Sequence, residues 1–213
     1  MGRGIQSTEE IRHDVRNRVI DVAMDAFCSE GVRNVTMDEI AHRLSMSKRT
    51  LYQLFADKES LLLAGIEERK KLHVELLEER NKITDNVLEL VLFDFGQRLE
   101  ALKEMNPQFL SDVSRFPKVV EAIKADRKLH MQKAVEFLQR GVSQELFRKD
   151  VNFEIIITML MNHIDNAVVM EQLRQFSPIE VFRHTVFTYL RGCTTPKGMA
   201  MMDKFAERWQ EGI

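Results

Sequence analysis

Helix signals run along the whole sequence, and strand signals are almost absent. None of the dipeptides Asn-Gly, Asp-Gly and Gly-Gly, which mark tight hairpins between strands, occurs in the 213 residues. Three of the four prolines stand where a helix would begin. Apolar residues recur at the spacings of three and four that put them on one helix face. We therefore predict an all-α fold.

Capping residues divide the first eighty residues into four helices. Gly31 follows an apolar stripe and is placed to end the first helix. Thr36 and Glu39 form a capping-box pattern that opens the second, and Ser47 and Asp57 are suited to cap the third and fourth. The predicted helices are about 10–30, 36–44, 48–54 and 57–80.

Further helices follow, and the chain is long enough for two modest domains. The boundary is expected inside the fourth helix near residue 70, so one long helix joins an N-terminal three-helix helix-turn-helix domain (10–70) to a C-terminal helical domain (71–213). The predicted later helices are about 84–104, 107–114, 118–146, 152–174 and 178–192, with a final piece after residue 198.

Residues 36–55 read as two capped helices around a three-residue turn. Leu51, Leu54 and Phe55 share the buried face of the second helix, which leaves Arg49, Gln53, Thr50 and Tyr52 on the open side. Arginine can read guanine and glutamine can read adenine in the major groove, while hydroxyls and the amides of helix N-termini suit phosphates. The spacing alone fits equally well an ordinary helical hairpin with a solvated polar face.

Net charge does not indicate a nucleic-acid partner, because it is −2 over the chain. Residues 1–60 hold nine Lys/Arg against ten Asp/Glu. Locally the picture differs: residues 42–56 contain Arg43, Lys48 and Arg49 and no acid. A local positive patch is enough for DNA, because the phosphate attraction acts over a Debye length of about 10 Å.

The stretch from about residue 12 to 71 resembles the DNA-binding domain of the TetR family of transcriptional regulators. The matching string is Ala23-x-x-x-Phe27-x-x-x-Gly31, Thr36-x-x-x-Ile40-Ala41, Ser47-Lys48-x-Thr50-Leu51-Tyr52-x-x-Phe55 and Asp57-Lys58-Glu59-x-Leu61. The resemblance implies a homodimer on double-stranded DNA, with the helix that Ser47 opens in the major groove. The DNA-contacting residues expected from pattern and resemblance together are Thr36, Ser47, Lys48, Arg49, Thr50, Tyr52, Gln53 and Lys58, with Thr36, Tyr52 and Lys58 on phosphates.

Two residues depart from the family pattern. The family commonly has glycine where this chain has Ser45 and Arg49. Serine is less suited than glycine to the turn, and Arg49 adds a long hydrogen-bond donor at a position that usually has no side chain. The base preference of other members therefore does not carry over to this chain.

The dimer interface is expected in the C-terminal domain, because the 155–173 helix is apolar nearly all round and must be buried on two sides. The helix that follows is also strongly apolar, and a monomer of this size can hardly cover both. In the family, two helices from each subunit form such a four-helix bundle. The predicted interface residues are Ile157, Met161, Val168, Met170, Phe182, Val186 and Tyr189.

The C-terminal domain is also where we expect a small apolar or aromatic effector to bind. Aromatic and flexible side chains there could wall a cavity, and two histidines could orient a ligand. The predicted pocket residues are Phe93, Phe95, Phe109, His130, Met131, Phe137, Met159 and His163.

Other classes find little support in the sequence. Two Glu-x-x-His motifs (Glu10/His13 and Glu39/His42) raise a di-iron bundle enzyme as a remote alternative, but both lie off the apolar stripe of their helices. No metal, cofactor or catalytic residue is expected. Cys28 and Cys193 have no metal-ligand spacing and suit a reducing cytoplasm, and no apolar run is long enough for a membrane span. The expected function is a repressor that an effector releases from a palindromic operator; an activator or a ligand-independent regulator stays open.

Overall fold

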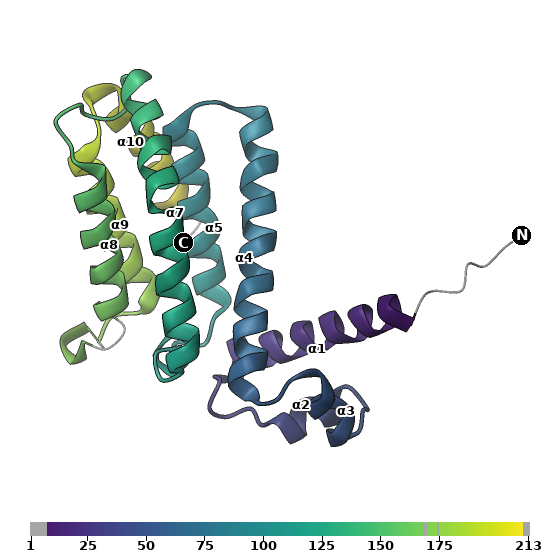
Figure 1. Cartoon of the computed structure of the whole chain (residues 1–213). Helices are drawn as coiled ribbons and strands as arrows, with labels where there is room; N and C mark the ends of the chain where they lie inside the picture. Colours follow the sequence, from purple (N-terminus) through teal and green to yellow (C-terminus); the bar gives the residue numbers. More distant parts are fainter. Residues whose placement is uncertain (1–7, 168–169, 174, 211–213) are drawn as a thin grey trace, which may run out of the picture. The chain divides into compact units, whose positions relative to one another are not determined.

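The structure is a computed structural model that describes residues 8–167, 170–173 and 175–210, and it confirms the all-α prediction (Figure 1). Among these residues the one isolated β-type pairing is an antiparallel bridge between Phe147 and Thr194. The helices are α1 (Thr8–Glu30), α2 (Met37–Arg43), α3 (Lys48–Leu54), α4 (Lys58–Ile83), α5 (Val87–Glu104), α6 (Gln108–Val113), α7 (Pro117–Ser143), α8 (Phe153–Ala167), α9 (Pro178–Cys193) and α10 (Pro196–Gln210), with a short 3-10 turn, η1 (Glu171–Leu173). No described helix is long and apolar enough to cross a membrane.

The chain forms two compact units. Unit 1 takes the chain up to Leu72 together with Met105–Ala122, and unit 2 takes His73–Glu104 and the chain from Ile123 onward. Helices α4 and α7 run without a break from one unit into the other. The segment Met105–Ala122, which the sequence analysis places in the second domain, therefore groups with the helix-turn-helix.

Unit 1 is built around a core that α1 to α4 share. Phe27 of α1, Ile40 of α2, Leu51 of α3 and Leu61 of α4 are all essentially buried. Gly65 shows how closely α4 approaches α1, because a Cβ there would lie 2.3 Å from the Met24 side chain. This core seats the two short helices α2 and α3 against the two long ones.

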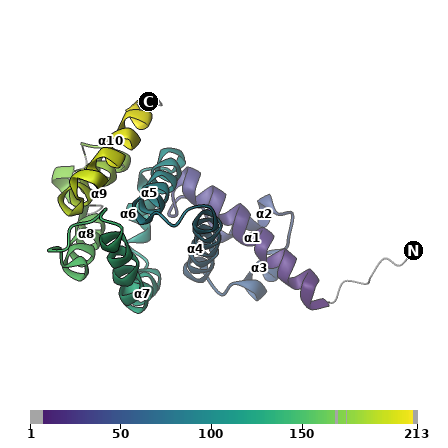
Figure 2. The ribbon, with the colours of Figure 1, turned by 90° about the horizontal axis from the view of Figure 1, so that it is seen from above.

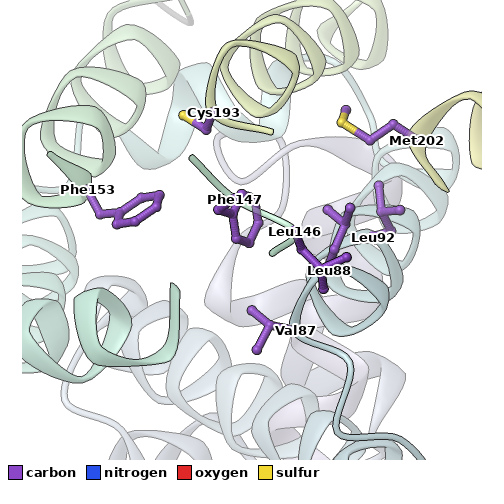
Figure 3. Close-up of a cluster of buried hydrophobic side chains, with 8 residues drawn as sticks. All are labelled: Val87, Leu88, Leu92, Leu146, Phe147, Phe153, Cys193 and Met202. Carbon is purple, nitrogen blue, oxygen red and sulfur yellow. The ribbon is translucent and has the colours of Figure 1, made fainter. Parts of the chain in front are cut away.

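Unit 2 is a bundle in which α5 and α8 both pack on α9, and α10 packs on α5. Figure 2 shows α5, α7 and α8 nearly end-on. One buried cluster is drawn in Figure 3, where side chains from four helices surround the connection after α7. Its members are Val87, Leu88, Leu92, Leu146, Phe147, Phe153, Cys193 and Met202.

Two helices end earlier than the apolar pattern predicts. Helix α7 stops at Ser143 rather than near 146, because Leu146 and Phe147 leave the helix and bury their side chains in the core of unit 2. Glu145 takes the left-handed backbone (φ 60°) that allows this change of direction. Helix α8 stops at Ala167 rather than near 174. Ser177 caps α9, and α9 packs against α8.

Candidate nucleic-acid interface

Helix α2 begins with the predicted capping box. The Thr36 hydroxyl accepts a hydrogen bond from the Glu39 amide (3.2 Å), and the Glu39 carboxylate accepts one from the Thr36 amide (2.6 Å). These two bonds satisfy amides that the first turn of a helix leaves without partners. They also lower the pKa of Glu39, chiefly through the backbone bond from Thr36. Glu39 is thus a cap, and the Glu-x-x-His motif that contains it has a structural explanation.

The turn between α2 and α3 depends on Ser45, whose backbone has φ 52°. Its amide donates to the His42 carbonyl at 3.0 Å, and the Met46 amide donates to the Ala41 carbonyl at 3.0 Å. The left-handed region disfavours residues with a Cβ, so this position suits glycine. The departure of Ser45 from the family pattern therefore falls on a strained residue.

Ser45→Gly is expected to stabilise the protein by about 0.5 to 1 kcal/mol, because glycine enters the left-handed region without the steric penalty of a Cβ. Urea unfolding followed by circular dichroism measures the change. Ser29→Gly is the matched control, since Ser29 lies in α1 and glycine weakens a helix. A loss of stability for both variants would show that the turn is not strained.

Helix α3 packs against the rest of unit 1 through its apolar face. Ser47 caps it, as predicted, by accepting the Thr50 amide at 3.1 Å. Leu51 and Phe55 are buried, and the Arg16 guanidinium of α1 lies 5.1 Å from the centre of the Phe55 ring. Sequence pattern and structure thus agree on which face of α3 turns inward.

The opposite face of α3 is open. Lys48, Arg49, Tyr52 and Gln53 are exposed, and the Tyr52 side chain keeps 49% of its surface accessible. The Arg49 side chain makes no hydrogen bond or ion pair with the part of unit 1 that the structure describes. Long donors held on a short, firmly seated helix can reach base edges in the major groove.

Lys58, at the start of α4, has a structural role that the sequence pattern missed. Its ammonium donates to the carbonyls of Val32 (2.8 Å) and Val35 (2.9 Å), both in the connection between α1 and α2. Partial burial lowers its pKa. An ammonium has three N–H donors, so one remains for a phosphate. Asp57 caps α4 as predicted, by accepting the Ser60 amide at 2.7 Å.

The segment around α6 contributes a second set of contacts that sequence reasoning missed. The Asp112 carboxylate is buried and accepts the Arg33 amide at 2.9 Å. Asn106 donates its amide to the Cys28 carbonyl (2.7 Å) and its side chain to the Ser29 carbonyl (3.2 Å). These bonds fasten α6 to the end of α1 and to the connection that leads into α2.

The predicted pocket residues fall into several different settings. Phe109 belongs to unit 1 and the others to unit 2. Phe95 stacks with Phe182 at 5.6 Å, and Phe137 packs on the cluster of Figure 3. Phe93 lies under the Arg80 guanidinium (5.3 Å from its carbon to the ring centre). Met131 is half-buried, and His130 and Met159 are exposed.

Two polar contacts join helices of unit 2 near its surface. His163 Nδ1 lies 2.7 Å from the Tyr189 hydroxyl and joins α8 to α9. Arg127 of α7 pairs with Asp165 of α8 at 2.6 Å. The residues that interrupt the apolar pattern of these helices therefore satisfy one another.

The predicted interface residues are only partly at the surface. Val186 is buried and Phe182 stacks on Phe95, so both belong to the core of unit 2. Ile157 also packs against the core. The apolar side chains that α8 leaves uncovered are instead Ile155 (54% exposed) and Met159 (45%). Of the remaining predicted residues, Met161 and Tyr189 are half-buried, Met170 is exposed, and Val168 lies outside the described residues.

Comparisons with known proteins agree with this geometry. Residues 19–64 match the model of the family described as bacterial regulatory proteins, tetR family. No curated protein sequence matches the chain. A TetR-family transcriptional regulator from Agrobacterium tumefaciens has the same fold (TM-score 0.66, 14% identity, 86% of this chain and 99% of that chain). So does the Saccharomonospora viridis regulator solved with choline (0.62, 18%, 86% and 99%). The Thermus thermophilus FadR repressor with lauroyl-CoA is similar as well (0.56, 19%, 83% and 94%).

Capped helices, a tight turn and an exposed basic helix define the chain as a helix-turn-helix DNA-binding protein. The matched residues 19–64 cover α2, α3 and most of α1 within this site. The part of the chain that carries this site thus matches the tetR family of bacterial regulatory proteins, and solved regulators of that family share the fold.

Proposed function

We propose that this regulator is a homodimeric repressor that binds a palindromic operator and is released from it by a small effector. The carrying observation is the open face of α3, on which Arg49 has no partner in the described part of unit 1 and Gln53 is exposed one turn further on. On this proposal the protein acts in the cytoplasm, where its DNA target would lie. Binding to an operator in a dimer requires the two α3 helices to lie about 34–36 Å apart, one turn of B-DNA.

On this proposal α3 reads bases and its surroundings hold phosphates. Arg49 is suited to the O6 and N7 atoms of guanine, and Gln53 to N6 and N7 of adenine. Thr36, Ser47, Thr50 and Tyr52 carry hydroxyls at or near helix N-termini, where phosphates are favoured. Lys48 and the third donor of Lys58 add charge to the same side.

The decisive experiment selects DNA from a random pool with the purified protein. We expect a palindromic site to be enriched, and a reporter placed behind that site should be silenced by the protein. Absence of any enriched sequence would contradict the operator proposal. Activation of the reporter would support sequence-specific DNA binding but contradict the proposed repression.

Arg49→Ala is expected to weaken binding to the selected site by about 1–3 kcal/mol per half-site and to relax the preference at one base pair. The reason is that it removes the guanidinium that can donate two hydrogen bonds to guanine. Competition between the selected duplex and single-base variants measures both effects. Gln132→Ala, an exposed change on α7, serves as the control and should alter neither. Equal losses on selected and random DNA would assign Arg49 to the phosphate backbone.

The proposed dimer surface is the uncovered side of α8 together with α9. Ile155 and Met159 lie one helical turn apart on α8, and Tyr189 lies on the neighbouring α9. Two copies that bury these side chains against each other would remove exposed apolar surface from water, which favours association. This face replaces Phe182, which is half-buried against Phe95, and the buried Val186 of the sequence-based interface.

The proposed effector site lies in unit 2 and takes a small molecule with a large apolar part. Support comes from the many half-buried apolar and aromatic side chains of α5, α7, α8 and α9, and from the fold shared with proteins solved with choline and with lauroyl-CoA. The ligand can release DNA only by binding the DNA-free state more tightly than the DNA-bound one. A thermal-shift screen followed by operator release tests this. Stabilising compounds that never change operator affinity would reject induction.

A further inference from the structure

Of the three basic side chains between residues 42 and 56, two form ion pairs with carboxylates. The Lys48 ammonium, at the first residue of α3, lies 2.5 Å from the Asp38 carboxylate in the first turn of α2. The Arg43 guanidinium binds both oxygens of Glu30, at 2.6 and 2.9 Å. Arg49 is the third basic group, and its side chain has no such partner in the described part of unit 1.

We propose that Asp38 holds Lys48 and so lowers the affinity of α3 for DNA of any sequence, because it limits the contacts of this helix with phosphates. This inference rests on the proposed DNA-reading function of α3. A lysine on a recognition helix attracts every duplex equally, because the phosphate charge is independent of sequence. Discrimination between sequences falls on Arg49 and Gln53, whose side chains can donate to particular base edges.

The Asp38–Lys48 ion pair fits a role in restraining Lys48 better than a role in stabilising the fold. Both partners are exposed (65% for Lys48 and 54% for Asp38), and exposed pairs contribute little to folding stability. Helix α2 does not need Asp38 for its cap, because Thr36 and Glu39 provide the capping box. The Asp38 charge also lies well within a Debye length of Lys48 and so opposes the approach of phosphates to the start of α3.

The matched comparison uses Asp38→Asn and Glu30→Gln, which each remove one negative charge and release one basic group from an exposed pair. Arg43 lies five positions after Asp38 in α2, about 140° around the helix, so it points away from the Asp38 side. Both variants are full-length and should keep the fold. Circular dichroism and thermal unfolding confirm that before DNA is added.

Binding of wild type and both variants to a selected duplex and to a random duplex is measured from 50 to 300 mM salt. For Asp38→Asn we expect random-DNA affinity to rise roughly fivefold per half-site near 0.15 M salt, with a log–log salt slope steeper by about 0.9 per half-site. Affinity for the selected duplex should rise by about the same factor, because its phosphates carry the same charge, so the ratio of selected to random affinity should stay near wild type. Glu30→Gln should leave the slope and the ratio near wild type.

Three outcomes would overturn the inference. An unchanged slope for Asp38→Asn would show that Lys48 gains no phosphate. Equal effects of the two variants would show that the change in net charge, and not the release of Lys48, alters DNA affinity. A loss confined to one base pair of the selected site would make Asp38 a direct base reader, since carboxylates accept from cytosine N4. If the wild-type protein itself failed to distinguish selected from random DNA, the proposed function would fail instead, and the two failures are therefore separable.

Discussion

Ile155→Asp is expected to leave the protein monomeric and to abolish tight operator binding. In a single chain Ile155 is 54% exposed, so the carboxylate remains in water and the fold is undisturbed. In the proposed dimer it would be buried against its symmetry mate. An uncompensated buried charge costs about 3–5 kcal/mol, which corresponds to a dimer weakened by more than about 100-fold. Sedimentation at micromolar concentration gives the oligomeric state, and a DNA titration gives the affinity.

Leu129→Asp is the matched control, because Leu129 is a 75% exposed apolar residue on α7, outside the proposed interface. It should leave both measurements unchanged. An Ile155→Asp protein that still sediments as a dimer would move the interface away from this face of α8. Loss of dimer by the Leu129 variant alone would point to α7.

Phe147→Ala is expected to cost about 3–5 kcal/mol of folding free energy, the largest loss of stability we expect from any single change in unit 2. The ring is buried, packs edge-on to Phe153 at 5.8 Å, and lies directly on the backbone of α7. A Cβ on Gly141 would come within 2.5 Å of it. Removing the ring leaves a cavity inside the buried cluster of Figure 3.

Urea unfolding followed by fluorescence and circular dichroism measures this loss. Phe176→Ala is the control, since the same atoms are removed from a side chain that is 49% exposed. Its effect should stay within about 0.5–1 kcal/mol. Similar small losses for both variants would mean that the Phe147 site closes around the missing ring.

Local signals made the helix-turn-helix predictable. Thr36, Glu39 and Ser47 cap helices through bonds that span three residues, and such bonds can be inferred from the sequence itself. The inward face of α3 followed from the positions of Leu51 and Phe55. The bounds of α3 accordingly agree with the prediction.

Contacts between distant segments were beyond the sequence pattern. Asp112 meets the amide of Arg33, 79 positions away, and nothing near either residue indicates the pair. The all-round apolar pattern of α8 predicts burial but not which side faces the core. That is why Ile157 was expected at the dimer surface, while Ile155 is the residue left uncovered. The pocket residues stay a prediction, since their spacing fixes a helix face and not a tertiary neighbour.

The insertion of Met105–Ala122 into unit 1 makes both units discontinuous in sequence. The chain crosses between them three times, at residues 72/73, 104/105 and 122/123, and two of these crossings lie inside the unbroken helices α4 and α7. A fragment ending at Leu72 would therefore lack Asn106 and Asp112, and would leave the Cys28 carbonyl and the Arg33 amide without their partners. Domain exchange between regulators is correspondingly restricted. A chimera that keeps unit 1 intact must take two separate stretches of the gene, and a single splice point in α4 separates Met105–Ala122 from the rest of unit 1.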